Sequence, residues 1–199
     1  MLDITRHQLC ISLRNPSKIH QHGVVPIIRG RDCILLAPPG IRRMTTLCIG
    51  VLQRVDMSVG GPQAILLANN DGDAREFRRI IDALCLVDEN SATKLRAARV
   101  LIGTERLVRD MISQQAVNSD DIKIYCVDDG EKVFSRRPAG QHDESLSHAL
   151  QTLHSWLPND IQIIIALSTM TDDVVGVTRQ IMSHPMTIAV HDDEAQDEV

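Results

Sequence analysis

Aromatic residues, paired cysteines and long apolar runs are all scarce in this sequence, and each shortage excludes or disfavours a kind of protein. Only four side chains are aromatic, which argues against a surface of stacking rings for single-stranded nucleic acid: Phe77, Tyr125, Phe134 and Trp156. The five cysteines are scattered, with no CxxC pair and no secretory leader before them, which predicts reduced thiols in an intracellular protein, cytoplasmic or nuclear. The longest apolar runs fall far short of the roughly 20 residues of a membrane helix, so we expect no membrane partner.

The net charge is small and is concentrated at one end. The formal charge of -5 is matched by five acidic residues near the C-terminus: Asp192, Asp193, Glu194, Asp197 and Glu198. The rest of the chain is formally neutral, whereas nucleic-acid binders usually present a basic surface. We therefore expect residues 191–199 to be an acidic, disordered tail. Residues 1–14 are a leader of uncertain structure, and residues 15–190 are expected to be one domain.

Short runs rich in Ile, Leu and Val alternate with segments of helical spacing. Six runs have the length of strands and are apolar toward both faces, as in a buried parallel sheet: 33–37, 64–68, 99–103, 122–128, 161–167 and 186–190. Helices are predicted between them, over 45–56, 71–84, 105–115, 144–156 and 171–183. This alternation predicts an α/β fold with a doubly wound, mostly parallel sheet flanked by helices.

The first turn from strand to helix is the place where such a fold would bind phosphate, because ligands gather at the carboxyl ends of the strands. Residues 37–45 read APPGIRRMT. From Ala37 to Met44 this matches the length of a phosphate-binding loop, A-x-x-G-x-G-K-T, but not its chemistry. Pro38 and Pro39, for example, lack the backbone N–H groups with which such a loop holds phosphate.

Beyond this turn, the chain resembles the N-terminal RecA-like domain of the DEAD-box RNA helicases, and is closest to their branch of eukaryotic translation initiation factor 4A. The resemblance covers residues 15–190 in the order of the family. It is clearest in the segments RGRDCILLAPPGIRRMTTLCIGVLQRVD, QAILLANNDGDAREFRRIIDAL, VLIGTERLVRDMI, DIKIYCVDDGEKVFSR and LPNDIQIIIALSTMTDDVVGVTRQIMSHPMTIAV. It implies a RecA-like fold whose signature motifs are degenerate.

The resemblance implies that three residues after Gly40 have replaced the Gly-Lys-Thr of the phosphate loop. Arg42 would crowd the loop, and Arg43 is a planar cation in place of a compact ammonium group. Met44 has no oxygen with which to ligate magnesium. His20 falls where the family has a glutamine that reads adenine, and an imidazole matches the adenine edge poorly. These vestigial positions predict that no nucleotide cofactor binds.

The carboxylate motif that gives the family its name becomes Asp128-Asp129-Gly130-Glu131. Asp128 keeps the carboxylate on the magnesium side, whereas Asp129 is one methylene shorter than the glutamate that would position water. The family's Ser-Ala-Thr becomes Leu167-Ser168-Thr169. The resemblance thus implies that the helicase and ATPase motifs are lost, and we predict that this protein is not an enzyme and has no catalytic residues.

Positions that face RNA in the family are altered as well. Asn69, Asn70 and Asp71 begin the segment that stands for Pro-Thr-Arg-Glu-Leu-Ala, and Thr104 and Glu105 stand in Thr-Pro-Gly-Arg. In the family these helix N-termini hold RNA phosphates. Acidic side chains there would stabilise the helices while repelling phosphate, so direct binding of RNA in the manner of the family is not expected.

Three histidines spaced six residues apart suggest a metal site at first sight. Six residues turn a helix by about 240°, so His142, His148 and His154 would not share one face. We predict no metal ion.

The leading hypothesis from the sequence is a pseudo-helicase, a catalytically inactive DEAD-box-like domain that serves as a protein–protein interaction module or scaffold in RNA-related regulation. The resemblance implies an α-helical repeat protein as its partner. The resemblance covers the first RecA-like domain of the family alone, so we expect no unwinding by this chain alone. The alternative is a residual ATP- or RNA-binding domain that works in trans with another RecA-like domain, and it would depend on Gly40, Arg43 and Asp128.

Overall fold

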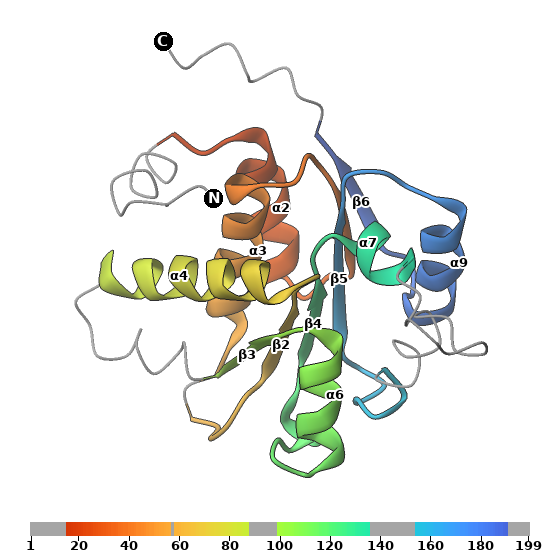
Figure 1. Cartoon of the computed structure of the whole chain (residues 1–199). Helices are drawn as coiled ribbons and strands as arrows, with labels where there is room; N and C mark the ends of the chain where they lie inside the picture. Colours follow the sequence, from red (N-terminus) through yellow and green to blue (C-terminus); the bar gives the residue numbers. More distant parts are fainter. Residues whose placement is uncertain (1–14, 57, 88–98, 136–153, 191–199) are drawn as a thin grey trace.

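The computed structural model describes residues 15–56, 58–87, 99–135 and 154–190, and within them six parallel strands form one sheet (Figure 1). The strands are β1 Cys33–Leu36, β2 Ala64–Leu67, β3 Val100–Gly103, β4 Ile124–Val127, β5 Gln162–Leu167 and β6 Met186–Ala189. Their order across the sheet is β3-β2-β4-β5-β1-β6. Each strand lies within one of the six apolar runs, so the predicted parallel α/β sheet is confirmed.

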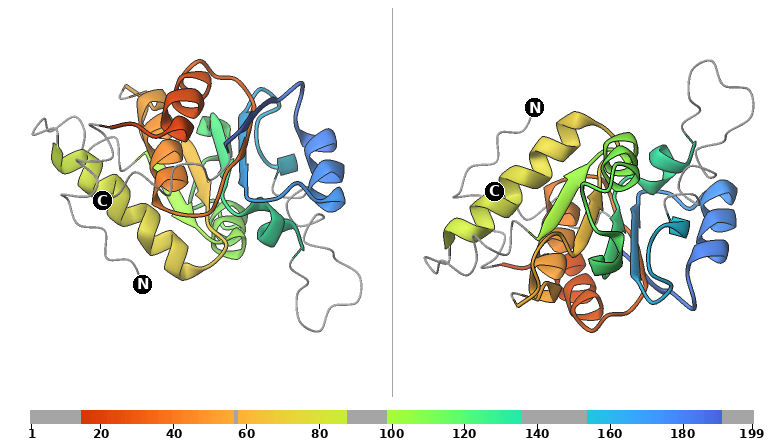
Figure 2. Two further views of the ribbon diagram at one scale, coloured as in Figure 1. Left: turned by 90° about the horizontal axis from the view of Figure 1, so that it is seen from above. Right: turned by 90° about the horizontal axis from the view of Figure 1, so that it is seen from below.

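Helices cover the two faces of the sheet in separate layers (Figures 1 and 2). One layer contains α2 Lys18–Ile28, α3 Ile41–Arg54 and α4 Asp71–Val87. The other contains α6 Glu105–Ser113, α7 Gly130–Ser135 and α9 Asp172–Ile181. Successive strand residues enter different cores: Leu35 packs with the first layer and Ile34 with the second. Burial on both faces explains why the strand sequences do not alternate between apolar and polar residues.

Two helices were not expected from the sequence, and a third begins earlier than predicted. Helix α2 contains Pro26 and has no acidic residue in its first turn, so local signals for a helix are weak. It forms against α3, where a Cβ at Gly50 would lie 2.5 Å from the Cγ2 of Ile27, and only glycine permits so close an approach. Helix α3 begins at Ile41, four residues before the predicted start, and α7 was missed altogether.

The other structural expectations concern thiols, membranes and the segments outside the described residues. Cys33, Cys48 and Cys126 are buried free thiols, and burial raises the pKa of Cys33 to about 11. Within the described ranges, no helix has both the length and the apolar character needed to cross a bilayer. The predicted leader, the acidic tail, and most of the helix predicted over 144–156 lie outside the described residues, as do His142 and His148.

Hydrogen bonds just beyond the strands bring several loops to the carboxyl edge of the sheet. The backbone N–H of Ala37, after β1, donates to the carbonyl of Leu167 at 2.9 Å. The N–H of Asp128, after β4, donates to the carbonyl of Leu67 at 3.0 Å. The degenerate phosphate loop and the altered carboxylate motif therefore begin at the same edge of the sheet, after two strands that β5 separates.

Candidate functional site

The turn after β1 depends on an unusual backbone conformation at Gly40. This residue precedes α3 with φ 146° and ψ -173°, a region that is almost exclusive to glycine. Its carbonyl accepts a hydrogen bond from the N–H of Met44 at 3.1 Å, which starts the helix. The glycine is therefore needed for the shape of the turn, whether or not a ligand approaches it.

Replacing Gly40 by alanine is expected to destabilise the domain by about 1–2 kcal/mol. A Cβ at this position would meet nothing within 4 Å, so the whole effect should come from the backbone conformation. Urea unfolding measures it, with Gly60→Ala as the control, because a Cβ at Gly60 also meets nothing within 4 Å. Equal stability of the two variants would contradict the assignment.

The Arg43 side chain turns inward and fills the space between this turn and the end of β4. It is 1% exposed. Its Nη1 donates a hydrogen bond to the carbonyl of Ala37 at 3.0 Å. Its Nε lies 2.8 Å from Oδ1 of Asp128, and its Nη2 donates to Oδ1 of Asp129. One guanidinium thus joins the first turn of α3 to both aspartates of the altered carboxylate motif.

A second cation completes a network of four charges. The Nζ of Lys132, on α7, lies 2.6 Å from Oδ2 of Asp129. Asp129 adopts a left-handed conformation with φ 51°, and its carbonyl accepts hydrogen bonds from the N–H groups of Lys132 and Val133 at 2.8 and 3.0 Å. Two carboxylates are therefore matched by two cations from the chain itself. We call Arg43, Asp128, Asp129 and Lys132 the charge network.

The two carboxylates of the charge network differ in their proton affinity. Burial raises the pKa of Asp128 to about 6, although the Arg43 guanidinium opposes this rise. Burial would also raise the pKa of Asp129, but hydrogen bonds from Lys132 and Arg43 outweigh it and hold that pKa below its usual value. The hydrogen bond to Asp129 in turn raises the pKa of Lys132. Asp129 is thus readily ionised beside its two cations, whereas ionisation of the buried Asp128 lowers the stability of the fold.

The other predicted nucleotide positions lie on the helices around the network. Met44 is 8% exposed and packs in the apolar core of the first layer. The carbonyl of Arg42 accepts a hydrogen bond from the Thr46 hydroxyl at 2.8 Å within α3. His20 is buried on α2, with its Nδ1 2.8 Å from the Oγ of Ser17. The structure therefore brings Arg43 together with Asp128 and Asp129, and gives Met44 a packing role.

The predicted RNA positions form the starts of two helices. Asn70 precedes α4, and its Oδ1 accepts a hydrogen bond from the N–H of Asp73 at 3.0 Å. Asp71 and Asp73 lie in the first turn of that helix. Thr104 precedes α6, and Glu105 forms an ion pair with Arg109 at 3.3 Å. Negative side chains thus occupy both helix N-termini, where they complement the helix dipoles.

Three residues of the site were missed or undervalued in the sequence. The Ser168 hydroxyl donates a hydrogen bond to Oε1 of Glu131, and the Ser168 N–H donates to the same oxygen at 3.2 Å. Glu131 is the fourth residue of the altered carboxylate motif, so the motif itself was an available signal for this contact. Lys132 had no such signal, because its contact depends on the turn at Asp129. Among the described residues, no group of three or more His, Cys, Asp or Glu side chains is placed to hold a metal ion.

Comparison with known proteins identifies relatives of this chain. No protein-family model matches the chain. It is 30% identical over 206 residues to the ATP-dependent RNA helicase eIF4A of Mycosarcoma maydis, a match that covers 96% of this chain and 48% of that protein. It is 31% identical over 193 residues to eukaryotic initiation factor 4A of Drosophila melanogaster, covering 90% of this chain and 46% of that protein. The chain is a homologue of the DEAD-box RNA helicases.

Solved structures agree with this assignment at the level of the fold. Dbp5 of Saccharomyces cerevisiae, in a structure with Gle1 and IP6, has a TM-score of 0.77 and 20% identity, over 94% of this chain and 50% of that one. A DEAD box protein of Methanococcus jannaschii has a TM-score of 0.74 and 14% identity, over 96% of this chain and 55% of that one. The predicted RecA-like fold is confirmed. This DEAD-box homologue spans about half the length of the curated relatives it matches.

Proposed function

We propose that this DEAD-box homologue is a pseudo-helicase domain that binds no ATP and acts as a protein-binding module or scaffold in RNA-related regulation, in the cytoplasm or nucleus. The observation behind the proposal is the buried Arg43 guanidinium, which bonds to Ala37, Asp128 and Asp129 at the edge where the phosphate loop meets the carboxylate motif. Those carboxylates are already neutralised from within the chain.

The charge network is incompatible with a magnesium nucleotide for two reasons. A divalent cation at Asp128 would lie within a few ångströms of the Arg43 guanidinium, and two like charges at such a separation in a buried site repel strongly. Displacing Arg43 would leave its guanidinium without the carboxylates that compensate its burial. The loop also lacks a hydroxyl at Met44 and N–H donors at Pro38 and Pro39. The residues present do not fit ATP, so we derive no catalytic step.

Binding of RNA in the manner of the family is also absent from the proposed role. Asp71, Asp73 and Glu105 place carboxylates at the two helix N-termini that would otherwise attract phosphate. We therefore propose that this fold acts through contacts with other proteins. The resemblance to this helicase family implies an α-helical repeat partner, so we propose an α-helical repeat protein of an RNA-regulatory complex as the partner.

Titration with a fluorescent ATP analogue and magnesium tests the proposed loss of nucleotide binding. We expect no saturable signal with this protein, and saturation with the matching half of the Drosophila relative, measured in parallel. The triple variant Arg42→Gly/Arg43→Lys/Met44→Thr, which restores the phosphate-loop residues, should bind more tightly than the parent. Micromolar binding by the unmodified chain that disappears in Asp128→Ala would overturn the proposal.

That last outcome would favour the alternative, a residual nucleotide-binding domain that acts in trans. One observation supports this alternative: Ser168 and Glu131 are hydrogen bonded across the carboxyl edge, at positions that correspond to two of the family's motifs. Adding a separate second RecA-like domain from a relative should then strengthen binding of the analogue. If the separate domain has no effect, the alternative fails.

A further inference from the structure

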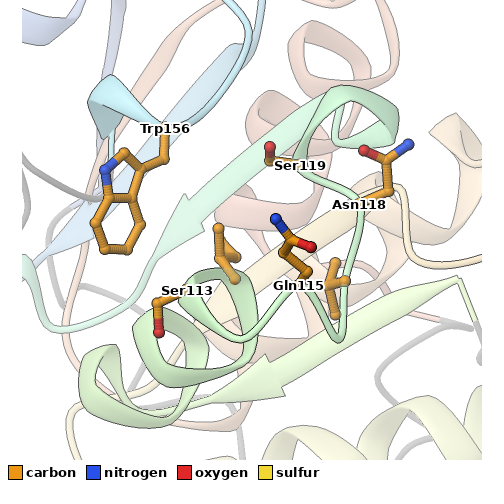
Figure 3. Close-up of a pocket in the computed structure, with 7 residues that line it drawn as sticks. Ser113, Gln115, Asn118, Ser119 and Trp156 are labelled. Atoms are coloured by element: carbon orange, nitrogen blue, oxygen red, sulfur yellow. The ribbon is translucent and has the colours of Figure 1, made fainter.

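A pocket of mixed chemistry lies at the amino edge of the sheet, opposite the charge network (Figure 3). It is formed by the end of α6, the loop from α6 to β4, and the turn before β5. Ile112 and Val117 contribute buried apolar side chains. Figure 3 shows the Trp156 ring on one side and Ser113 and Gln115 on the other. The pocket therefore offers an aromatic face opposite hydroxyl and amide groups.

Trp156 is partly exposed, so its ring can stack against a planar ligand. Its side chain is 38% exposed, although burial of an indole ring is one of the largest apolar gains available to a protein. It is also the one tryptophan in the sequence. The faces of an indole ring attract cations, and the planar guanidinium of arginine stacks on them more readily than the ammonium of lysine.

Gln115 occupies a backbone position that normally belongs to glycine. It follows α6 with φ 57°, and the N–H groups of Gln115 and Ala116 close the helix by donating to the carbonyls of Ile112 and Met111, both at 2.9 Å. Glycine is the usual residue at such a helix end. Among the described residues, none forms a hydrogen bond with the Gln115 side-chain amide. Gln115 therefore stands at a helix end where glycine is usual, and its side chain lines the pocket.

Most of the charges close to the pocket along the chain are negative, although Arg109 precedes and exposed Lys123 follows the segment that lines it. The segment from residue 110 to residue 122 contains Asp110, Asp120 and Asp121 and no lysine or arginine. Asp160, in the turn that follows Trp156, adds another carboxylate, and both Asp120 and Asp160 are exposed. Such a rim repels phosphate groups and attracts basic segments. The charges thus favour a basic peptide over RNA as the ligand.

We propose that this pocket binds an arginine side chain from a basic segment of a partner protein. The guanidinium stacks on Trp156 and donates a hydrogen bond to the amide oxygen of Gln115, while Asp120 and Asp121 supply the complementary charge. The inference rests on the proposed protein-binding role, because it names one surface and the chemistry of its partner. It does not depend on the state of the charge network at the opposite edge.

Because Trp156 is the one tryptophan, its fluorescence and its indole N–H resonance report on this pocket alone. The probes are a short flexible peptide with two arginines, the same peptide with glutamine in their place, and a single-stranded oligouridine. We expect a saturable change with the arginine peptide that weakens as salt is raised, and no saturable change with the other two. No response to the arginine peptide, or a stronger response to the oligouridine, would overturn the proposal.

Two variants connect the response to the residues named. Asp120→Asn should weaken binding of the arginine peptide about fivefold, as expected for an exposed charge pair. Gln115→Gly should weaken it as well while unfolding at the same or a higher temperature, because glycine suits the backbone there. Unchanged binding in both variants would refute the proposed site. If ATP binds and Trp156 also responds to the arginine peptide, the pseudo-helicase proposal fails but the proposed arginine pocket stands. If neither ATP nor the peptide binds, the arginine pocket fails and the loss of nucleotide binding stands.

Discussion

Replacing Arg43 by methionine is expected to destabilise the domain by about 3–5 kcal/mol at pH 7. Methionine is long enough to occupy much of the same volume, so the loss should come from charge and not from a cavity. Without the guanidinium, Asp128 and Asp129 would remain buried beside each other with Lys132 alone as counter-ion. Equilibrium unfolding in urea measures the change in free energy. For a typical domain this loss is a large share of the total stability.

The same substitution at an exposed arginine is the matched control. The Nε of Arg78 lies 3.6 Å from Oδ1 of Asp82 on α4, and both side chains are 57% exposed. Arg78→Met should therefore cost less than about 1 kcal/mol. Similar losses in the two variants would show that the Arg43 guanidinium has no special structural role.

A second variant separates the loss of charge balance from a general failure to fold. Adding Asp128→Asn and Asp129→Asn to Arg43→Met removes both buried carboxylates together with the guanidinium. Replacing a whole buried ionic group is often nearly neutral, whereas removing Arg43 alone leaves two buried carboxylates with one cation. The triple variant should thus recover most of the stability that Arg43→Met loses, and Arg43→Met should lose less at pH 5 than at pH 7, because its carboxyl groups take up protons.

Local sequence signals predicted those elements whose pattern is complete within a single segment. The six strands are continuous apolar runs, and α4, α6 and α9 each have a clear apolar face. Helix α2 lacks such signals and exists because Gly23 and Gly50 let it pack closely on α3: a Cβ at Gly23 would lie 2.9 Å from the Cγ2 of Thr46. Helix α7 spans only six residues after the left-handed turn at Asp129. These two helices depend on tertiary contacts, and such contacts cannot be read from a single sequence.

The location of the candidate site could be predicted, but its internal geometry could not. The carboxyl edge of the sheet followed from topology, which placed Gly40 near Asp128 and Asp129. The inward turn of Arg43 joins residues 86 positions apart, and nothing in the local sequence distinguishes it from a cation that waits for phosphate. The pocket at Trp156 could not be predicted from the sequence either, because Gln115 and Trp156 come from separate segments that only the fold brings together.

Asp128 is expected to make the stability of the domain fall as pH rises from about 4 to about 6. Its folded pKa is raised to about 6, whereas an unfolded aspartate titrates near about 3.9. Between these values the folded state binds more protons than the unfolded state, so the free energy of unfolding decreases with pH. A difference of about two pKa units corresponds to about 3 kcal/mol. The ionised Asp128 is thus a burden on the fold at neutral pH, in contrast to Arg43.

Comparison with Asp128→Asn isolates this effect from other titrating groups. The pKa of His154 is lowered by burial, so protonation of this imidazole destabilises the fold as pH falls, and it would oppose the Asp128 effect in the same range. Because His154 is present in both proteins, its contribution cancels in the difference. Asparagine resembles the protonated aspartic acid, so the two proteins should be about equally stable at pH 4, and the variant more stable by about 3 kcal/mol at pH 7.5. A stability difference that does not change with pH would mean that Asp128 is ionised throughout, held by Arg43 as strongly as Asp129 is.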